Sequence, residues 1–111
     1  LRIPAPLAPV KLAVLPLVKK DGLPEKAHAI VDLLKYDHNL QYDDKDSIGR
    51  RYRRQDAIGT PYCITIDHQT LLDETVTIRD RDTMQQERVA IGELHRIVSE
   101  KVDLRKLLKQ L

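Results

Sequence analysis

The sequence predicts an α/β fold in which a mixed five-stranded sheet carries helices on both faces. Two observations indicate this class. Strand-like apolar runs alternate with amphipathic helical stretches in the first half, and two strand-like segments follow each other across a short link near residues 71–74. Strands separated by helices pair in parallel through right-handed crossovers, whereas a short link joins antiparallel strands. We therefore expect the fourth strand to run antiparallel to the others.

The first half of the chain supplies two strands and two helices. Residues 1–9 contain three prolines and are expected to be a linker, and residues 11–17 (KLAVLPL) form a nearly continuous apolar strand. Pro24 suits the first turn of a helix whose apolar positions follow the i, i+3, i+4, i+7 rule. A short strand over 40–44 comes next. Ser47 is the expected N-cap of a second helix.

The second half supplies three strands and a final helix. Residues 62–67 (YCITID) predict a third strand, 69–74 a turn, 75–80 (TVTIRD) an alternating fourth strand and 84–91 a fifth. From residue 94 onward, leucine, isoleucine and valine follow helical spacing to Leu111. Because the chain starts at Leu1 and stops inside this pattern, we expect a piece of a longer protein, with a domain over 10–111.

Composition restricts the partners that the chain could bind. Its 111 residues, 41% hydrophobic and 32% charged, are typical of one globular domain. The net charge of only +2 means that a polyanion would have to be bound by a local patch. The single cysteine, Cys63, excludes an internal disulfide and is consistent with a reducing compartment. The apolar run 12–18 is too short to span a bilayer, so no membrane partner is expected.

Four arginines fall within five residues in the segment SIGRRYRRQDAIGTP, residues 47–61. A helical wheel with Ile48 and Tyr52 toward the core directs Arg50, Arg53 and Arg54 outward and places Arg51 on the flank. One interpretation is a solvated basic helix face. The other is a polyanion footprint, because the arginine fork pairs phosphate in a bidentate manner.

A second charged segment, residues 79–83 (RDRDT), lies between the fourth and fifth strands. If the fourth strand is antiparallel, this segment meets residues 57–61 at the sheet edge where the arginine helix ends. The two basic clusters would then form one site. The alternative is a surface ladder of ion pairs.

Catalytic and metal-binding patterns are not found in the sequence. It has no Walker A loop, no GxGxxG motif and no paired-cysteine motif, and its four histidines are scattered without HxxxH spacing. Cys63 lies within a strand and is expected to be a buried structural thiol. Asp80 and Asp82 lie beside arginines that should keep them ionised, which argues against acid–base work. We therefore expect a binding domain and assign no catalytic residue and no metal ligand.

Three stretches carry a resemblance to a known family: LAPVKLAVLPLVKKDGL, SIGRRYRRQDAIGTPYCITID and TVTIRDRDTMQQERVAI. Over roughly residues 7–111 the chain resembles the C-terminal anticodon-binding domain of class II glycyl-tRNA synthetases. The resemblance implies a three-layer α/β/α sandwich and recognition of the anticodon stem-loop of glycine tRNA. It also implies a cytoplasmic, homodimeric parent ligase that uses ATP with magnesium and has its catalytic motifs upstream. The piece by itself is expected to be a non-catalytic monomer.

The resemblance also implies where RNA is bound. Glycine anticodons end in two cytosines. The amino group of cytosine can donate a hydrogen bond to a carboxylate, and its O2 and N3 atoms can accept hydrogen bonds from an arginine. Asp82 is the first candidate reader, with Asp80 and Glu87 next. Gly59 and Pro61 either let the backbone approach RNA or simply end the helix. The full predicted tRNA-binding set is Arg50, Arg51, Arg53, Arg54, Gly59, Thr60, Arg79, Asp80, Arg81, Asp82 and Thr83.

Two other functions stay open at this point. The accessory subunit of mitochondrial DNA polymerase uses a similar domain, so the chain could be a synthetase-like interaction module. A small-ligand α/β domain that binds at the strand ends near Lys19, Lys20 and Gly22 is the second alternative, although no phosphate loop supports it.

Overall fold

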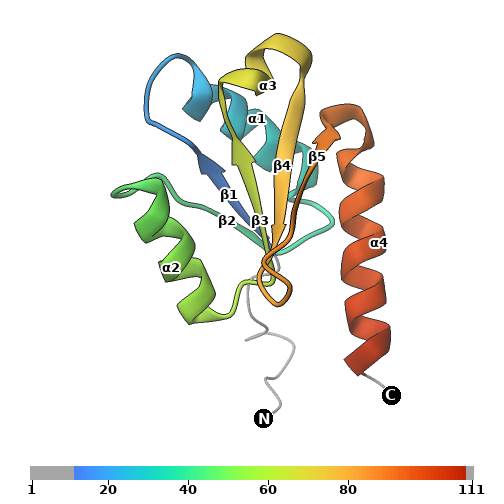
Figure 1. The fold of residues 1–111 in the computed structure, drawn as a ribbon. Helices are drawn as coiled ribbons and strands as arrows, with labels where there is room; N and C mark the ends of the chain where they lie inside the picture. The colour runs from blue at the N-terminus through green and yellow to red at the C-terminus, as the bar shows by residue number, and fades with distance from the viewer. Residues whose placement is uncertain (1–11, 110–111) are drawn as a thin grey trace.

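The computed structural model describes residues 12–109, and Figure 1 shows its fold. The predicted linker, residues 1–9, lies outside this part of the chain. The elements in order are β1 (Leu12–Pro16), α1 (Leu23–Leu34), β2 (Leu40–Tyr42), α2 (Ile48–Ile58), β3 (Tyr62–Ile66), α3 (His68–Asp73), β4 (Thr75–Asp80), β5 (Gln86–Ala90) and α4 (Ile91–Lys109).

The five strands form one mixed sheet in the order β2-β1-β3-β4-β5. β1 pairs in parallel with β2 and β3, while β4 runs antiparallel to both of its neighbours, β3 and β5. The predicted fold class and the single antiparallel strand are therefore confirmed. The reversal of β4 brings its last residue, Asp80, opposite the first residue of β3, Tyr62.

Helices cover both faces of the sheet, as the α/β/α prediction requires (Figure 1). On one face, apolar side chains of α1 and α4 such as Leu23 and Leu94 pack on a core that includes Ile64 and Val76. On the other face, Ile48 and Tyr52 of α2 pack on a smaller cluster of Ala13, Leu15 and Cys63. The apolar contact of α2 with the middle of the sheet is thus made by Ile48 and Tyr52, which lie one helical turn apart.

The predicted turn over 69–74 is wrong, because this segment forms the short helix α3. Asp67 caps the helix in a capping box: its carboxylate accepts from the Thr70 amide at 3.1 Å, and the Thr70 hydroxyl accepts from the Asp67 amide at 3.1 Å. Glu74 ends the helix in the left-handed region. β5 also begins later than predicted, at Gln86, because Met84 takes a positive φ of 61° in the hairpin.

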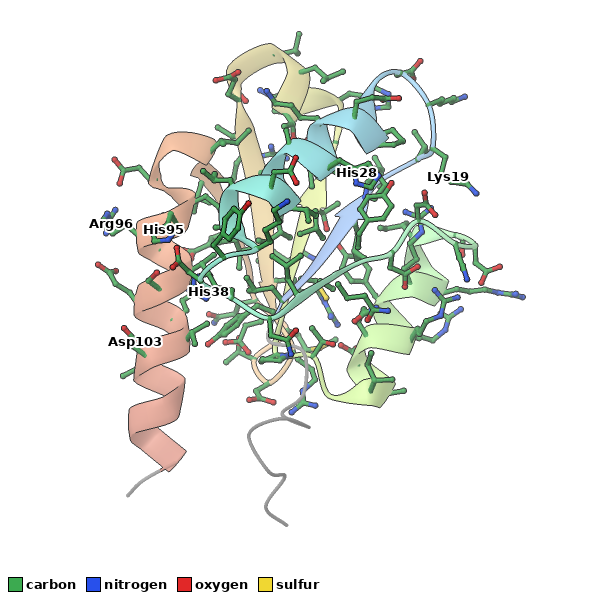
Figure 2. All side chains as sticks on the ribbon, turned by 180° about the vertical axis from the view of Figure 1, so that it is seen from behind. Lys19, His28, His38, His95, Arg96 and Asp103 are labelled. Carbon is green, nitrogen blue, oxygen red and sulfur yellow. The ribbon has the colours of Figure 1, made fainter. Side chains whose placement is uncertain are left out.

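Two of the scattered histidines meet where α4 packs on the α1–β2 connection. Figure 2 shows His38 and His95 on these two segments, and their ring centroids are 5.8 Å apart. The His95 Nε2 lies 2.7 Å from an Asp37 carboxylate oxygen, and the His38 Nε2 lies 3.4 Å from the Ser99 hydroxyl. Burial, and then the neighbouring His95, lower the pKa of His38 against the opposing effects of Asp37 and Asp103.

We expect this contact to make stability depend on pH. Because the pKa of His38 is lowered in the folded chain, the unfolded chain binds the proton more readily, and stability falls as pH drops below the ordinary value of 6.5. Urea unfolding above and below pH 6.5 measures this. His38→Gln should show a smaller loss than the parent chain, and an equal loss in both would contradict the expectation.

Candidate nucleic-acid interface

Two loops far apart in the sequence meet at one end of the sheet. We call residues 59–61 and 81–85 together the loop cluster. The Arg81 amide donates to the Pro61 carbonyl oxygen at 2.9 Å, so the predicted convergence of the two segments is present in the structure. Gly59 ends α2 with a φ of 86°, and a Cβ atom there would lie 3.4 Å from Nη1 of Arg81. Gly59 therefore works as the helix terminator and also allows the second loop to approach closely.

Two of the four helix arginines pair with other groups of the protein. Arg51 is buried and donates to the backbone carbonyl oxygens of Pro16, Lys45 and Asp46, the last two at 3.1 and 2.9 Å. Arg54 makes ion pairs with Asp43 at 2.7 Å and Asp46 at 2.5 Å. The prediction that Arg51 lies on the flank is wrong, because its side chain is buried. Arg54 points away from the core, as the wheel indicates, but its guanidinium is paired with the two aspartates. Both arginines tie α2 to the segment that precedes it.

Asp43 is the buried centre of this arrangement. Burial alone would raise its pKa, but hydrogen bonds from Arg54, from the Lys45 amide and from Gln55 outweigh that effect and hold the pKa below its usual value. Gln55 donates to Asp43 at 3.1 Å and accepts from the Thr60 hydroxyl at 2.8 Å. The Thr60 side chain, predicted to bind RNA, is therefore buried and used within the protein.

Arg50 and Arg53 are the exposed guanidinium groups of α2. Ser47 accepts from the Arg50 amide at 3.3 Å and caps the helix as predicted, which fixes where this exposed face begins. Of the three arginines that the wheel directs outward, Arg50 and Arg53 are exposed, and Arg54 is partly exposed and paired with two aspartates.

Arg79 lies beneath the loop cluster rather than on its surface. Only 8% of its side chain is exposed, and its guanidinium makes two hydrogen bonds to Asp56 of α2 at 3.1 and 3.2 Å. The same group lies 4.9 Å from the centre of the Tyr52 ring. The predicted location of Arg79 at the RNA-facing surface is wrong, because α2 covers this side of β4.

The hairpin between β4 and β5 is shaped by its own polar side chains. An Asp80 carboxylate oxygen accepts from the amides of Asp82 and Thr83 at 2.8 and 3.3 Å, and the Thr83 hydroxyl accepts from the Gln85 amide at 3.2 Å. These contacts form a tight turn. Arg81 and Asp82 make an ion pair with each other at 3.4 Å, on the part of the turn that faces solvent.

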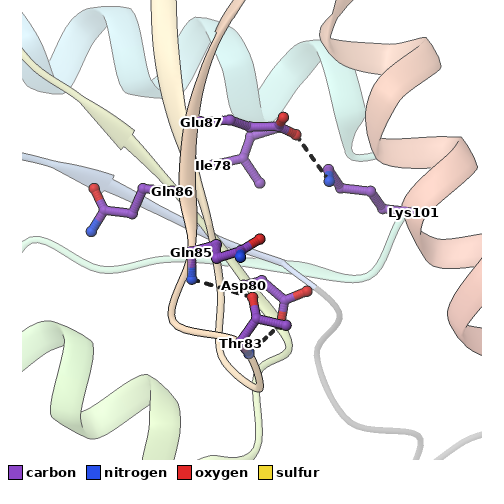
Figure 3. Close-up of a pocket in the computed structure, with 7 residues that line it drawn as sticks. All are labelled: Ile78, Asp80, Thr83, Gln85, Gln86, Glu87 and Lys101. Atoms are coloured by element: carbon purple, nitrogen blue, oxygen red, sulfur yellow. Dashed lines mark hydrogen bonds and ion pairs between the residues drawn. The ribbon is translucent and has the colours of Figure 1, made fainter.

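A cavity of about 400 Å³ opens beside this hairpin, between β5 and α4 (Figure 3). Glu87 and Lys101 face each other across it, with an oxygen–nitrogen distance of 2.9 Å. Both are partly exposed, at 54% and 31%. Its lining residues are Ile78, Asp80, Thr83, Gln85, Gln86, Glu87 and Lys101.

The lining of the cavity suits a flat, polar heterocycle. It offers a carboxylate that accepts, an ammonium that donates, amides that do both, and the apolar side chain of Ile78. Sequence reasoning named Asp80 and Thr83, and Glu87 as a later candidate, but missed Gln85, Gln86 and Lys101. The period-2 pattern of the fifth strand could have grouped residues 85 and 87, whereas nothing in the sequence places Lys101 of α4 beside them.

Other chemistry has little support in the part of the chain that the structure describes. No group of three or more histidine, cysteine, aspartate or glutamate residues there could hold a metal ion. Burial raises the pKa of Cys63 to about 12, so this thiol stays protonated, as expected for a structural residue. No helix among residues 12–109 is long and apolar enough to cross a membrane.

An α/β/α sandwich with exposed arginines on one helix and a polar cavity at the adjoining loops has the features of a nucleic-acid-binding domain. The family model described as "Anticodon binding domain" matches residues 11–101, and the chain belongs to this family.

The chain is also similar to glycine–tRNA ligases. It is 61% identical over 88 residues to the ligase of Rhodopirellula baltica, covering 79% of this chain and 16% of the relative. It is 52% identical over 98 residues to the ligase of Borrelia hermsii, covering 88% of this chain and 22% of the relative. The chain thus spans about a fifth of the length of these relatives. They give no support to a polymerase accessory module.

Solved structures confirm the fold. The prolyl-tRNA synthetase of Cryptosporidium parvum aligns with a TM-score of 0.83 at 19% identity, covering 97% of this chain and 24% of that one. The RNA-binding domain of threonyl-tRNA synthetase from the same organism aligns with a TM-score of 0.75 at 24% identity, covering 85% of this chain and 24% of that one.

Proposed function

We propose that this chain is the anticodon-binding domain of a glycine–tRNA ligase and that its loop cluster binds the anticodon loop of glycine tRNA. The observation that carries the proposal is the open cavity with Glu87 and Lys101 at the loop cluster of a member of this family. The similarity to glycine–tRNA ligases supports glycine as the amino acid.

The whole protein would then attach glycine to tRNA. ATP, with magnesium, would activate glycine at a site outside this chain, in a cytoplasmic enzyme that we expect to be a homodimer. This chain alone would be a monomer that binds RNA and forms no glycyl-adenylate.

We place one anticodon cytosine in the cavity. The amino group of cytosine donates to a carboxylate, while its O2 and N3 atoms accept from a cation. Glu87 and Lys101 offer both partners on opposite walls, and they satisfy each other when no base is present. The ion pair of Arg81 and Asp82, on the solvent-facing part of the turn, offers the same two groups to a neighbouring base of the loop.

The outer face of α2 supplies the phosphate contacts in this proposal. Arg50 and Arg53 are exposed, while Arg51 is buried and Arg54 is ion-paired with Asp43. Phosphate contacts orient an RNA without reading its sequence, so these two arginines should act alike on every tRNA.

Replacing both Arg50 and Arg53 by alanine should weaken binding of all stem-loops equally and flatten its salt dependence. Each lost phosphate contact should lower the slope of log affinity against log salt by about 0.7. Fluorescence anisotropy with labelled anticodon stem-loops over a range of salt concentrations measures this slope.

The matched control replaces Lys35 and Arg96 by alanine. It removes the same net charge from groups that are paired with Asp32, Glu93 and Glu100. This control should keep the slope of the parent chain. The same slope in the parent chain, the Arg50 and Arg53 double variant and the control would mean that the α2 arginines form only a solvated helix face.

A further inference from the structure

The two surfaces assigned to RNA belong to different elements. The phosphate-contacting arginines lie on α2, and the base-reading groups lie on the β4–β5 hairpin and α4. An anticodon loop can use both only if α2 and the hairpin keep a fixed separation, because binding groups must be held within a fraction of an ångström of their productive position.

Arg79 connects these two elements through a side chain that is almost fully buried. Its guanidinium donates to both carboxylate oxygens of Asp56 on α2, at 3.1 and 3.2 Å, and its Nη2 also lies 3.1 Å from the Met84 sulfur. Met84 belongs to the hairpin, where its amide donates to the Asp80 carbonyl oxygen at 2.8 Å. One planar group therefore contacts the last turns of α2 on one side and the hairpin on the other.

The geometry of Arg79 restricts it in two directions. The two parallel hydrogen bonds to Asp56 fix the guanidinium within its plane, and the Tyr52 ring, 4.9 Å away, fixes it perpendicular to that plane. A lysine could supply the same charge but neither the fork nor the stacking. These features suit a residue that holds neighbouring groups in position and does more than supply charge.

We propose that Arg79 and Asp56 are a positioning pair for anticodon reading: they hold the β4–β5 hairpin at a fixed distance from the RNA-contacting face of α2. The inference rests on the proposed function, since it assumes that both surfaces engage one RNA loop. Neither residue contacts the RNA. Loss of the pair shifts the hairpin relative to α2. The protein then still folds but discriminates less between bases.

The test uses the full-length ligase that contains this chain, with the variants Arg79→Lys and Asp56→Asn. Asp56→Asn keeps the size of a side chain that is 32% exposed, so this variant folds even if Arg79→Lys does not. The readout is the ratio of kcat/KM for glycine tRNA transcripts with cytosine and with uracil at one anticodon position. Melting temperature and glycine-dependent ATP–pyrophosphate exchange are measured beside it.

Arg88→Lys is the matched control. Arg88 lies on β5 of the same sheet and makes an ion pair with Asp67 at 2.5 Å, near α3 at the opposite end of the sheet from the loop cluster. We expect the cytosine-to-uracil ratio to fall by about five- to tenfold in both test variants, within the range that one base contact is worth. The ratio should stay unchanged in Arg88→Lys, and Asp56→Glu should regain part of it.

Two results would count against the proposal. A cytosine-to-uracil ratio equal to wild type in folded Asp56→Asn would overturn the positioning role, whether activity is kept or is lost equally on both transcripts. If the wild-type enzyme itself does not distinguish cytosine from uracil, the proposed function fails, and the positioning role fails with it. Unchanged ATP–pyrophosphate exchange in all variants confirms that the distant catalytic step is intact.

Discussion

Replacing Glu87 by glutamine should cost the ligase about 1–3 kcal/mol of its preference for cytosine over uracil at one anticodon position. The reason is that the carboxylate only accepts a hydrogen bond, which the cytosine amino group donates. An amide can also donate a hydrogen bond to the uracil carbonyl at the same place. Glu87 lies in the cavity opposite Lys101, and the substitution keeps its size. Aminoacylation of wild-type and C-to-U transcripts measures the effect.

Asp82→Asn is the informative comparison. Asp82 lies at the turn and makes an ion pair with Arg81, but it does not line the cavity. If the cavity reads the base, Glu87→Gln loses discrimination and Asp82→Asn loses less. The reverse order would assign the reading to the turn, as the sequence first suggested, and no change in either variant would leave Asp80 as the remaining carboxylate of the segment.

Replacing Arg51 by methionine should destabilise the 111-residue chain by about 3 kcal/mol, because buried carbonyl groups lose a charged donor. Three backbone carbonyls, those of Pro16, Lys45 and Asp46, accept from this one guanidinium. These hydrogen bonds from Arg51 hold β1 and the segment before α2 together. Urea unfolding of the chain measures the change in the free energy of unfolding.

Arg53→Met is the matched control for this experiment. Arg53 lies two residues further along the same helix and is exposed, so its replacement should change stability by only about 0.5 kcal/mol or less. Equal losses in the two variants would contradict the structural role of Arg51.

The strands and three of the four helices could be predicted because each has a local signal. The run at 12–16 is apolar on both faces, β4 alternates, and Ser47 caps α2. α3 was missed because six residues are too few to show a helical period, and its only clear sign is the capping box of Asp67 and Thr70. The antiparallel direction of β4 followed from the short link alone.

The roles of the arginines could be predicted only in part. The sequence shows where the charges are but not which carboxylates come to lie beside them. Asp43, which pairs with Arg54, precedes it by eleven residues, and Asp56, which pairs with Arg79, precedes it by twenty-three. Whether a charged side chain is free for a ligand depends on such pairings, and these form only when the sheet and α2 are packed.

The location of the cavity could not be predicted for a similar reason. Glu87 and Lys101 lie on β5 and α4, and their contact depends on how far α4 is rotated about its axis. The helical spacing of leucine, isoleucine and valine shows which stripe of α4 is buried, but it fixes neither the exact rotation of the helix nor its height along the sheet. A polar residue on the flank of that stripe, such as Lys101, could therefore not be matched to its partner.

The central claim is that the loop cluster and the adjoining cavity bind the anticodon loop. The most direct test is an amide chemical-shift map of the isotope-labelled 111-residue chain, titrated with the anticodon stem-loop of glycine tRNA. We predict that the largest shifts fall on residues 59–61, 81–87 and Lys101, with smaller ones along α2. Shifts concentrated instead on α3 and residues 19–22, at the opposite end of the sheet, would contradict the claim.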